Sequence, residues 1–350
     1  DSQYKKCPQL NFLQMVSLAS GLPLQWPDAV NTMFTTMNTV SSAGTTLLIP
    51  DCELTRIRAA DAFFMKQVFF AFVPVIIVTV CATSWAFIWK ICSGGTQQST
   101  TRCRKCSTIT KKSHAKNYFV LSVTLCLFLL YPTMVRLTLS VFKCRKVGEG
   151  RFLVADLQEP CYEGRHLTYI LTSTVPQLIL YVFGLPILGT IILLRNKRSY
   201  NRYNFRMRYG LLYLGYGRGR EWFEVVVAAR KVAIVTVATL FSVGTSVDLQ
   251  AFLALFVVFV SIVIHLTVKP FDVASSSGRL LHQLEFVALS VCFLTFWSGL
   301  LFFLGHKQPE TMSQPFLIFV SVCIVIGNVL FLTLCVFEFV KEFVNDFRNK

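Results

Sequence analysis

The sequence is poor in charged residues, and acidic residues are especially few. Asp, Glu, Lys and Arg make up 15% of the 350 residues, whereas a soluble domain carries about 25%. Hydrophobic residues account for 54% of the chain and include 32 phenylalanines. This balance argues against a soluble globular protein and indicates a chain that exposes much of its surface to lipid.

The sequence signatures of common enzymes are also absent. The chain contains no H-E-x-x-H, no G-x-S-x-G and no phosphate-binding loop motif. Its five histidines are scattered along the chain. No Ser–His pair or pair of acids can therefore be assembled at one depth for a membrane-embedded hydrolase. We expect no enzymatic activity, no cofactor and no metal site.

Long apolar stretches occupy most of the chain. A helix needs about 20 apolar residues to cross the hydrocarbon core, and these stretches are too long and too uniformly apolar for barrel strands. We therefore predict an all-α polytopic transmembrane bundle with seven spans. The expected spans are Asp61–Ile91, Asn117–Phe142, Leu167–Leu194, Trp222–Val243, Leu249–Val268, Leu281–Leu304 and Pro315–Phe339.

Basic residues concentrate in two loops, and this sets the expected orientation. The loop 93–116 has six basic residues and no acid, and the loop 195–221 has eight basic residues and one acid, Glu221. Because positive loops stay cytoplasmic, we predict that the N-terminus lies outside and the C-terminus inside. The net charge of +16 then reflects membrane topology, and we expect no nucleic-acid partner.

This topology divides the chain into three parts. Residues 1–60 form an extracellular pre-membrane segment, in which apolar residues at helical spacing predict amphipathic helices. These helices lack a basic face for anionic lipid, so we expect them to pack on the rim of the bundle. Residues 61–339 form the transmembrane bundle, and residues 340–350 form a cytoplasmic tail.

The predicted outer side contains an even number of cysteines. Cys144 and Cys161 share one short loop, whereas Cys7 and Cys52 precede the first span. Disulfides form in oxidising compartments. We therefore predict a Cys144–Cys161 bond and, by default, a Cys7–Cys52 bond.

Ionisable residues inside the predicted spans are the main candidate functional residues. Glu224, Arg230 and Lys231 in the fourth span, His265 in the fifth and Glu285 in the sixth fall at one depth near the cytoplasmic face. An unpaired charge several residues inside a span costs about 2.5 kcal/mol or more. Arg230 therefore needs an acid from another helix, and Glu285 is the nearest candidate. A structural salt-bridge network, a gate and a lipid-headgroup site all remain compatible with this cluster.

Two other sets of basic residues are of interest. Arg136 lies within the second span, about two turns from its outer end. It is either a pore or cavity residue, or a side chain that extends its head to the membrane surface. The basic loop before the fourth span is a candidate site for anionic or phosphoinositide headgroups. Its candidate arginines are Arg206, Arg208, Arg218 and Arg220.

Several motifs resemble one family of membrane regions. They are Leu153-Val154-Ala155-Asp156 between Cys144 and Cys161, Gly184-Leu185-Pro186, Arg208-Tyr209-Gly210-Leu211-Leu212-Tyr213, Glu221-Trp222-Phe223-Glu224 and Lys269-Pro270-Phe271. The pattern is similar to the C-terminal membrane region of large surface proteins of algae, ciliates and oomycetes. Those proteins often carry Cys-rich, ephrin-receptor-like repeats upstream, and their membrane regions are described as similar to transient receptor potential (TRP) or polycystin channels.

The resemblance implies a channel-like or channel-associated sensory protein in the plasma membrane or in a ciliary or flagellar membrane. Its expected partners are membrane lipids, other membrane subunits and an upstream ectodomain. One departure concerns the pore, because the connection Gly305–Gln314 is too short for the pore helix and filter of a TRP channel. The alternative function is a non-conducting anchor or receptor for an ectodomain. The chain begins without Met or a signal peptide, so we expect it to belong to a longer precursor.

Overall fold

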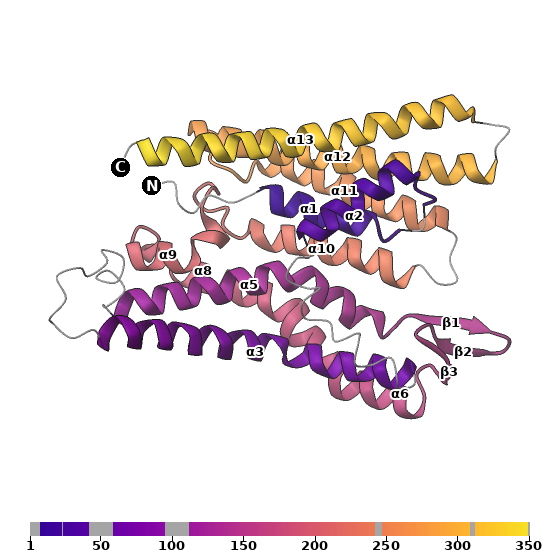
Figure 1. Ribbon diagram of the computed structural model, residues 1–350, viewed down its shortest axis with the longest axis horizontal. Helices are drawn as coiled ribbons and strands as arrows, with labels where there is room; N and C mark the ends of the chain where they lie inside the picture. Colours follow the sequence, from indigo (N-terminus) through magenta and orange to yellow (C-terminus); the bar gives the residue numbers. More distant parts are fainter. Residues whose placement is uncertain are drawn as a thin grey trace.

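The computed structural model describes residues 8–22, 24–41, 59–94, 112–241, 247–308 and 312–348. Long helices run side by side to form a bundle, and a small sheet lies at one end (Figure 1). The elements are α1 (Pro8–Ala19), α2 (Asp28–Ser41), α3 (Ala59–Gly94), α5 (Lys112–Ser140), β1 (Cys144–Val147), β2 (Gly150–Leu153), β3 (Asp156–Pro160), α6 (Gly164–Tyr169), η3 (Ile170–Thr174), α7 (Val175–Gln177), η4 (Leu178–Phe183), α8 (Gly184–Arg195), η5 (Lys197–Ser199), α9 (Tyr203–Tyr213), α10 (Phe223–Leu240), α11 (Val247–Val268), α12 (Ser276–Lys307) and α13 (Gln314–Arg348).

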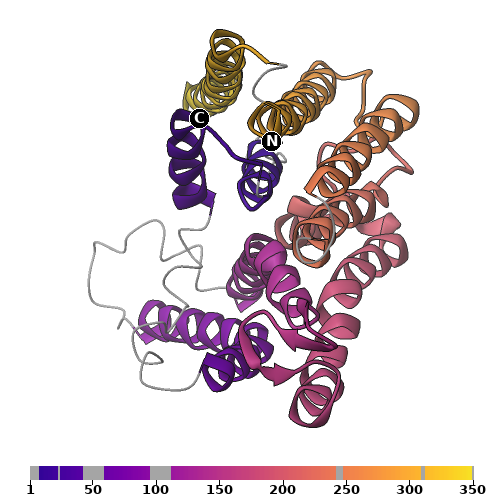
Figure 2. The same ribbon diagram turned by 90° about the vertical axis from the view of Figure 1, so that its right-hand side faces the viewer.

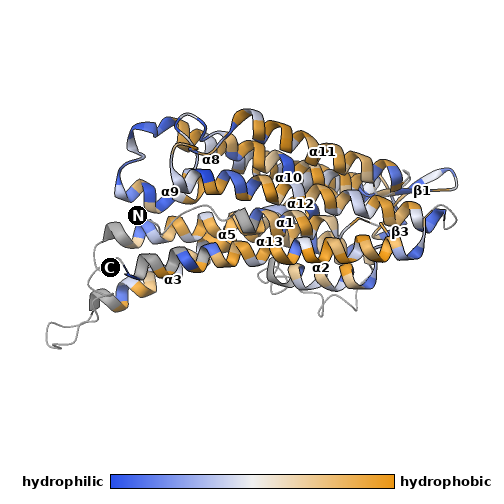
Figure 3. Ribbon diagram, turned by 90° about the horizontal axis from the view of Figure 1, so that it is seen from above, coloured by the Kyte–Doolittle hydropathy of each residue, from blue (hydrophilic) through white to orange (hydrophobic). Residues whose placement is uncertain are grey.

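Six helical segments in the described part of the chain are long and apolar enough to cross a membrane. Hydrophobic residues cover the middle of the bundle, whereas hydrophilic residues gather near α9 and near the sheet (Figure 3). The protein is therefore a multi-pass membrane protein. The six segments are Ala59–Ile91, Ala115–Ser140, Gly164–Arg195, Val247–Val268, Ser276–Lys307 and Gln314–Glu338.

The predicted fourth span corresponds to α10, which is not among these six. This helix has 18 residues and carries three charged residues, Glu224, Arg230 and Lys231. It nevertheless runs alongside the long helices and packs against α5, α8 and α11 (Figure 1). The seventh span and the orientation of the bundle stay predictions.

A three-stranded antiparallel sheet corrects the expectation of a purely helical fold. The strand order is β1-β2-β3, with Cys144 opposite Leu153 and Val147 opposite Gly150. Leu153 is fully buried, whereas most residues of β1 are exposed. The sheet lies at the opposite end of the molecule from α9 and the C-terminus (Figure 1).

The helices α1 and α2 form a hairpin that packs into the bundle. Viewed along the bundle, α1 lies among the long helices and contacts α10 and α12 (Figure 2). Its Phe12 ring lies 4.5 Å from that of Phe331 in the middle of α13. At the turn of the hairpin, Trp26 covers α12 so closely that a Cβ on Gly299 would lie 2.5 Å from its ring. The hairpin thus forms part of the main apolar core instead of covering only the rim.

The third span departs from regular α-helix where it contains prolines. Two π-helical stretches, η3 and η4, flank the short α7, which contains Pro176. Pro186 has no N–H to donate to the carbonyl oxygen of Val182, four residues earlier. The hydroxyl of Tyr131 on α5 donates to this oxygen instead, at 2.8 Å. A neighbouring helix therefore satisfies the backbone acceptor that proline leaves open in the membrane.

Candidate functional site

The predicted disulfide ties the sheet into a closed loop. Cys144 begins β1 and Cys161 directly follows β3, and their Cα atoms lie 6.3 Å apart across the bond. The backbone N–H of Cys161 also donates to the carbonyl oxygen of Arg151 at 2.8 Å. The Cys144–Cys161 pairing is thus confirmed. Cys7 and Cys52 lie outside the described residues, and their pairing stays a prediction.

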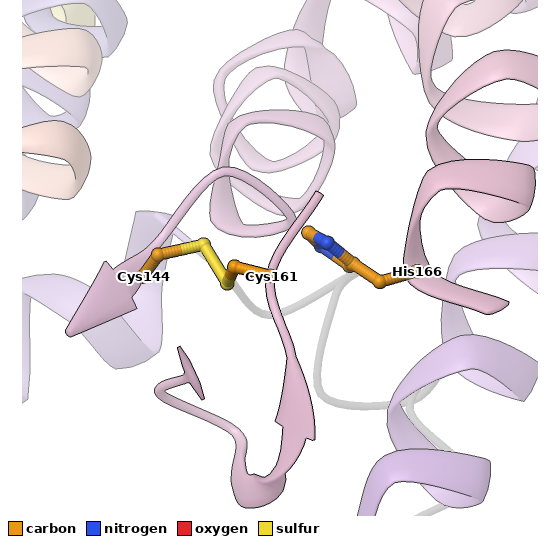
Figure 4. Close-up of side chains that lie close together, drawn as sticks. All are labelled: Cys144, Cys161 and His166. Atoms are coloured by element: carbon orange, nitrogen blue, oxygen red, sulfur yellow. A yellow bond between two sulfur atoms is a disulfide. The ribbon is translucent and has the colours of Figure 1, made fainter. Parts of the chain in front are cut away.

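A buried histidine, not expected from the sequence, lies beside this bond (Figure 4). His166 is 0% exposed. Its Nδ1 accepts a hydrogen bond from the Tyr162 backbone N–H at 2.8 Å, and its Nε2 lies 3.0 Å from the Val141 carbonyl oxygen. A carbonyl only accepts, so Nε2 carries the proton and the ring is neutral.

The same three side chains have the composition of a metal site. The sulfur atoms of Cys144 and Cys161 and a ring nitrogen of His166 lie within 4.8 Å of one another. The sulfurs are bonded to each other, however, and both ring nitrogens are engaged in hydrogen bonds. In this oxidised state the cluster therefore supports the fold of the loop and offers no free ligand atom.

Polar contacts join the sheet to the first turn of α3. The Asp156 carboxylate accepts a hydrogen bond from the Ala60 backbone N–H at 3.2 Å. Arg165, at the start of α6, forms ion pairs with Asp61 of α3 at 2.5 Å and with Glu159 of β3 at 2.9 Å. One arginine therefore connects the sheet, the first span and the third span.

Apolar contacts reinforce this junction. The guanidinium of Arg165 lies 5.2 Å from the centre of the Phe64 ring. The Phe64 ring also stacks on Tyr169 at 4.2 Å. Phe64 and Leu153 belong to a small buried cluster next to the disulfide, so the loop is packed onto the helices as well as hydrogen-bonded to them.

At the other end of the bundle, Arg230 and Glu285 form the predicted interhelical ion pair. The Nη2 atom of Arg230 lies 2.9 Å from Oε1 of Glu285, and each side chain is only 6% exposed. The pair connects α10 to α12. Arg230 Nε has no hydrogen-bond partner among the described residues. The pair therefore depends on one good contact, and loss of either partner would leave a buried charge.

His265 and Tyr216 complete the surroundings of the pair. The His265 ring stacks on His282 at 4.5 Å, and its Nε2 lies 3.2 Å from the His282 carbonyl oxygen. Tyr216, which precedes α10, donates its hydroxyl to Glu224 at 3.0 Å. Burial raises the pKa of the Tyr216 phenol well above its usual value, and the carboxylates of Glu224 and Glu285 raise it further. The hydrogen bond between Tyr216 and Glu224 was not expected from the sequence.

The remaining members of the predicted cluster, which both lie on α10, border a cavity. Glu224 and Lys231 line a cavity of about 170 Å³ between α5, α8, α9 and α10. The Lys231 ammonium lies 4.5 Å from the centre of the Phe128 ring on α5. The structure thus divides the cluster into a buried pair next to His265 and two charges on the wall of a cavity.

Among the candidate lipid-binding arginines, Arg208 and Arg220 make hydrogen bonds within the protein. Arg208 Nε donates to Asn117 Oδ1 at 2.7 Å, and Asn117 is itself fully buried. The Arg220 guanidinium donates to the carbonyl oxygen of Lys269. Arg218 is exposed. These contacts give Arg208 and Arg220 a structural role, whichever lipids lie nearby.

The candidate residues Arg206 and Arg136 are not among the residues that line the cavity. Arg206 is half-buried on α9, and Arg136 is exposed on α5. Burial lowers the pKa of Lys143, and the charge of Arg136 lowers it further. The charge of Arg136 is therefore felt at Lys143, between the end of α5 and the sheet. Both interpretations of Arg136, as a pore or cavity residue and as a side chain that extends to the membrane surface, stay predictions.

The six long apolar helices define a multi-pass membrane protein. A comparison with known proteins finds a similar sequence. The chain is 26% identical over 208 residues to Cysteine repeat modular protein A of Toxoplasma gondii. The match covers 56% of this chain, but the chain spans only 6% of that protein's length. No protein family and no solved structure matches the chain. The similarity to a cysteine-repeat protein agrees with part of the expected resemblance, whereas the TRP or polycystin part gains no support.

Proposed function

We propose that this chain is the membrane module of a larger surface protein, and that it anchors an ectodomain and couples it to the helix bundle. The observation that carries the proposal is the junction of the disulfide-tied sheet with α3 and α6. In the predicted orientation the junction faces the outside, where an ectodomain would act on it. The similarity to a cysteine-repeat modular protein supports a place within a longer chain.

The junction suits a coupling role because its contacts are directional and mutually dependent. Arg165 holds Asp61 and Glu159 at the same time, and Asp156 fixes the backbone of the first turn of α3. A displacement of the sheet would therefore shift the starts of the first and third spans together. The disulfide keeps the sheet itself from opening under such a displacement.

Cysteine labelling in intact cells tests the orientation on which this proposal rests. Leu157→Cys in β3 and Lys307→Cys at the end of α12 should react with a membrane-impermeant maleimide. Arg218→Cys should react only after the cells are permeabilised, and the unsubstituted chain gives the background. All three positions are exposed in the structure. The reverse pattern of labelling would refute the proposed orientation and the outward-facing junction.

Hydrogen exchange in detergent tests the coupling itself. Cys144→Ser with Cys161→Ser should speed amide exchange in the first turn of α3, because Ala60 N–H is held by Asp156 of the sheet. Exchange in α13, which lies on the opposite side of the bundle from the sheet (Figures 1 and 2), serves as the internal control. Unchanged exchange in α3 would show that the disulfide-tied loop and the first span are not coupled.

A channel-like function is the second candidate, and one observation favours it. Several polar side chains in the core have atoms without a hydrogen-bond partner among the described residues, and buried polar groups normally hold a partner or an ordered water. They include Asn11 and Gln14 on α1, Gln250 on α11 and Asn328 on α13. Reconstitution into planar bilayers would test this candidate. A current reduced by Gln14→Leu would favour it, and the absence of any current would leave the anchor function.

A further inference from the structure

The cavity between α5, α8, α9 and α10 combines an apolar wall with a basic surface at one end. We propose that it binds part of one acyl chain of an anionic phospholipid, whose headgroup lies against the basic residues at the end of α8 and in η5. The inference rests on the membrane location and the predicted cytoplasmic side of α9. It does not depend on whether the sheet couples an ectodomain to the bundle.

The lining of the cavity suits a methylene chain. Apolar side chains provide most of the wall and include Leu127, Phe128, Leu185, Leu188, Ile192 and Leu212. Tyr131 and Thr190 also line the cavity, and each donates its hydroxyl hydrogen bond to a backbone carbonyl oxygen of the bundle. Of the two charged lining residues, Glu224 accepts a hydrogen bond from Tyr216 and the Lys231 ammonium lies over the Phe128 ring. Few polar groups thus remain for a polar solute, and the apolar surface favours a chain that displaces water from it.

The cavity is open toward the lipid side of α8. Leu188 lines it and is 53% exposed, and Ile187 and Ile191 on the same helix are also exposed. The opening exists partly because position 189 is a glycine. A Cβ there would meet only Leu212 at 3.7 Å, so the space beside α8 is free. A lipid chain can therefore enter from the bilayer without displacing a helix.

Charge selects the lipid class. The cavity reaches Leu193, two residues before Arg195 ends α8, and Lys197 and Arg198 follow directly in η5. All three basic side chains are exposed. Basic residues beside the membrane attract anionic headgroups. A lipid whose chain occupies the cavity would place its phosphate near these three residues.

The size of the cavity excludes a protein partner. A volume of about 170 Å³ is comparable to that of an engineered cavity that holds one small apolar molecule. A helix of another subunit is about 10 Å wide and cannot enter it. A single hydrocarbon chain is narrow enough, so a lipid is the occupant that fits both the shape and the surroundings.

Photolabelling in nanodiscs tests the occupied cavity. The probe is phosphatidylserine with a diazirine in one acyl chain, present at low mole fraction in phosphatidylcholine. Peptides of α5 and α8 should be labelled in the parent chain. Gly189→Leu should weaken this labelling about tenfold, because a leucine excludes roughly two methylene groups from the site.

Gly327→Leu is the matched control. Gly327 lies on α13, where an added Cβ meets no atom within 4 Å, and it is remote from the cavity lining. Labelling of α5 and α8 should be unchanged in this variant. Equal labelling in the Gly189 and Gly327 variants would overturn the proposal. If Gly189→Leu does not fold, Gly189→Ala replaces it and should reduce labelling about threefold.

A competition experiment tests the headgroup. Unlabelled phosphatidylserine should displace the probe better than phosphatidylcholine does in the parent chain. The triple change Arg195→Gln, Lys197→Gln and Arg198→Gln should remove this preference and leave the chain labelled. Equal competition by the two lipids in the parent chain, or a preference that survives the triple change, would refute the assignment of an anionic headgroup.

Discussion

Replacement of Glu285 by Gln isolates the charge of the ion pair between α10 and α12. Gln has nearly the same shape as Glu, so the packing of α12 is kept while Arg230 loses its counter-charge. The pair is direct, at 2.9 Å, and both side chains are 6% exposed. Loss of one partner of such a buried pair costs about 3–5 kcal/mol. Arg230 Nε already lacks a partner among the described residues, which leaves little compensation.

A double substitution separates the pair from its surroundings. Arg230→Met with Glu285→Leu removes both charges and fills the space with apolar side chains of similar size. Such replacements are often neutral or stabilising, so we expect a loss of at most about 1 kcal/mol for the double variant. The effects of the single substitutions Arg230→Met and Glu285→Leu on the free energy of unfolding should then differ in sum from the effect of the double variant by about 2 kcal/mol or more. Equilibrium unfolding in mixed micelles, followed by far-UV circular dichroism, measures these values.

Glu338→Gln on α13 is the control for this series. Glu338 pairs with Lys341 at 3.4 Å on the surface, and exposed pairs contribute about 0–1 kcal/mol. The reasoning fails if Glu285→Gln costs no more than Glu338→Gln. It also fails if the two single substitutions at the buried pair add up to the effect of the double one.

Three further substitutions test other parts of the structure. Cys161→Ser should lower the free energy of unfolding by about 3 kcal/mol in the chain-entropy model and make the loop sensitive to protease, whereas a resistant loop would argue against a structural disulfide. Gly278→Ala should lower the melting temperature, because its Cβ would lie 2.0 Å from the Asp272 carbonyl oxygen, and an unchanged melting temperature would contradict the close approach. Tyr216→Phe should cost about 1–3 kcal/mol by removing the hydrogen bond to Glu224, and a neutral effect would show that this bond is not needed.

Several features could be predicted from the sequence because each depends on few variables. Apolar length alone predicts the six long helices, since the thickness of the bilayer fixes the number of residues required. Cys144 and Cys161 lie in one short loop, which restricts their possible partners. Arg230 and Glu285 fall at one depth, and the cost of an isolated charge in lipid favours their pairing.

Depth in the membrane does not determine which face of α10 each charged residue lies on. The angle between residues around the helix axis does. Glu224 and Lys231 are seven residues apart, which places them on one face of α10, whereas Arg230 points about 100° away from Lys231. This spacing was available in the sequence and could have predicted the division of the cluster. The role of Tyr216 was not available, because it depends on how the segment before α10 folds against Phe271.

The sheet and the hairpin α1–α2 were the least predictable elements. The strands are short and largely exposed, so alternation of apolar and polar residues is weak in them. The disulfide and the contacts with α3 supply the stability that the strands lack. The position of α1 depends on packing against α12 and α13, which are the last helices in the sequence. Local patterns contain no information on such distant contacts.

The hairpin has a consequence for the order of assembly. Phe12 leaves the ribosome long before Phe331, the residue on which its ring packs. The hairpin therefore cannot pack against α12 and α13 until these helices have been synthesised and inserted into the membrane. Until then its apolar face stays uncovered. Contacts between such distant segments form slowly. Completion of the core is thus a late step in biogenesis, and a ribosome that stops before α13 would release a chain whose hairpin has no place to dock.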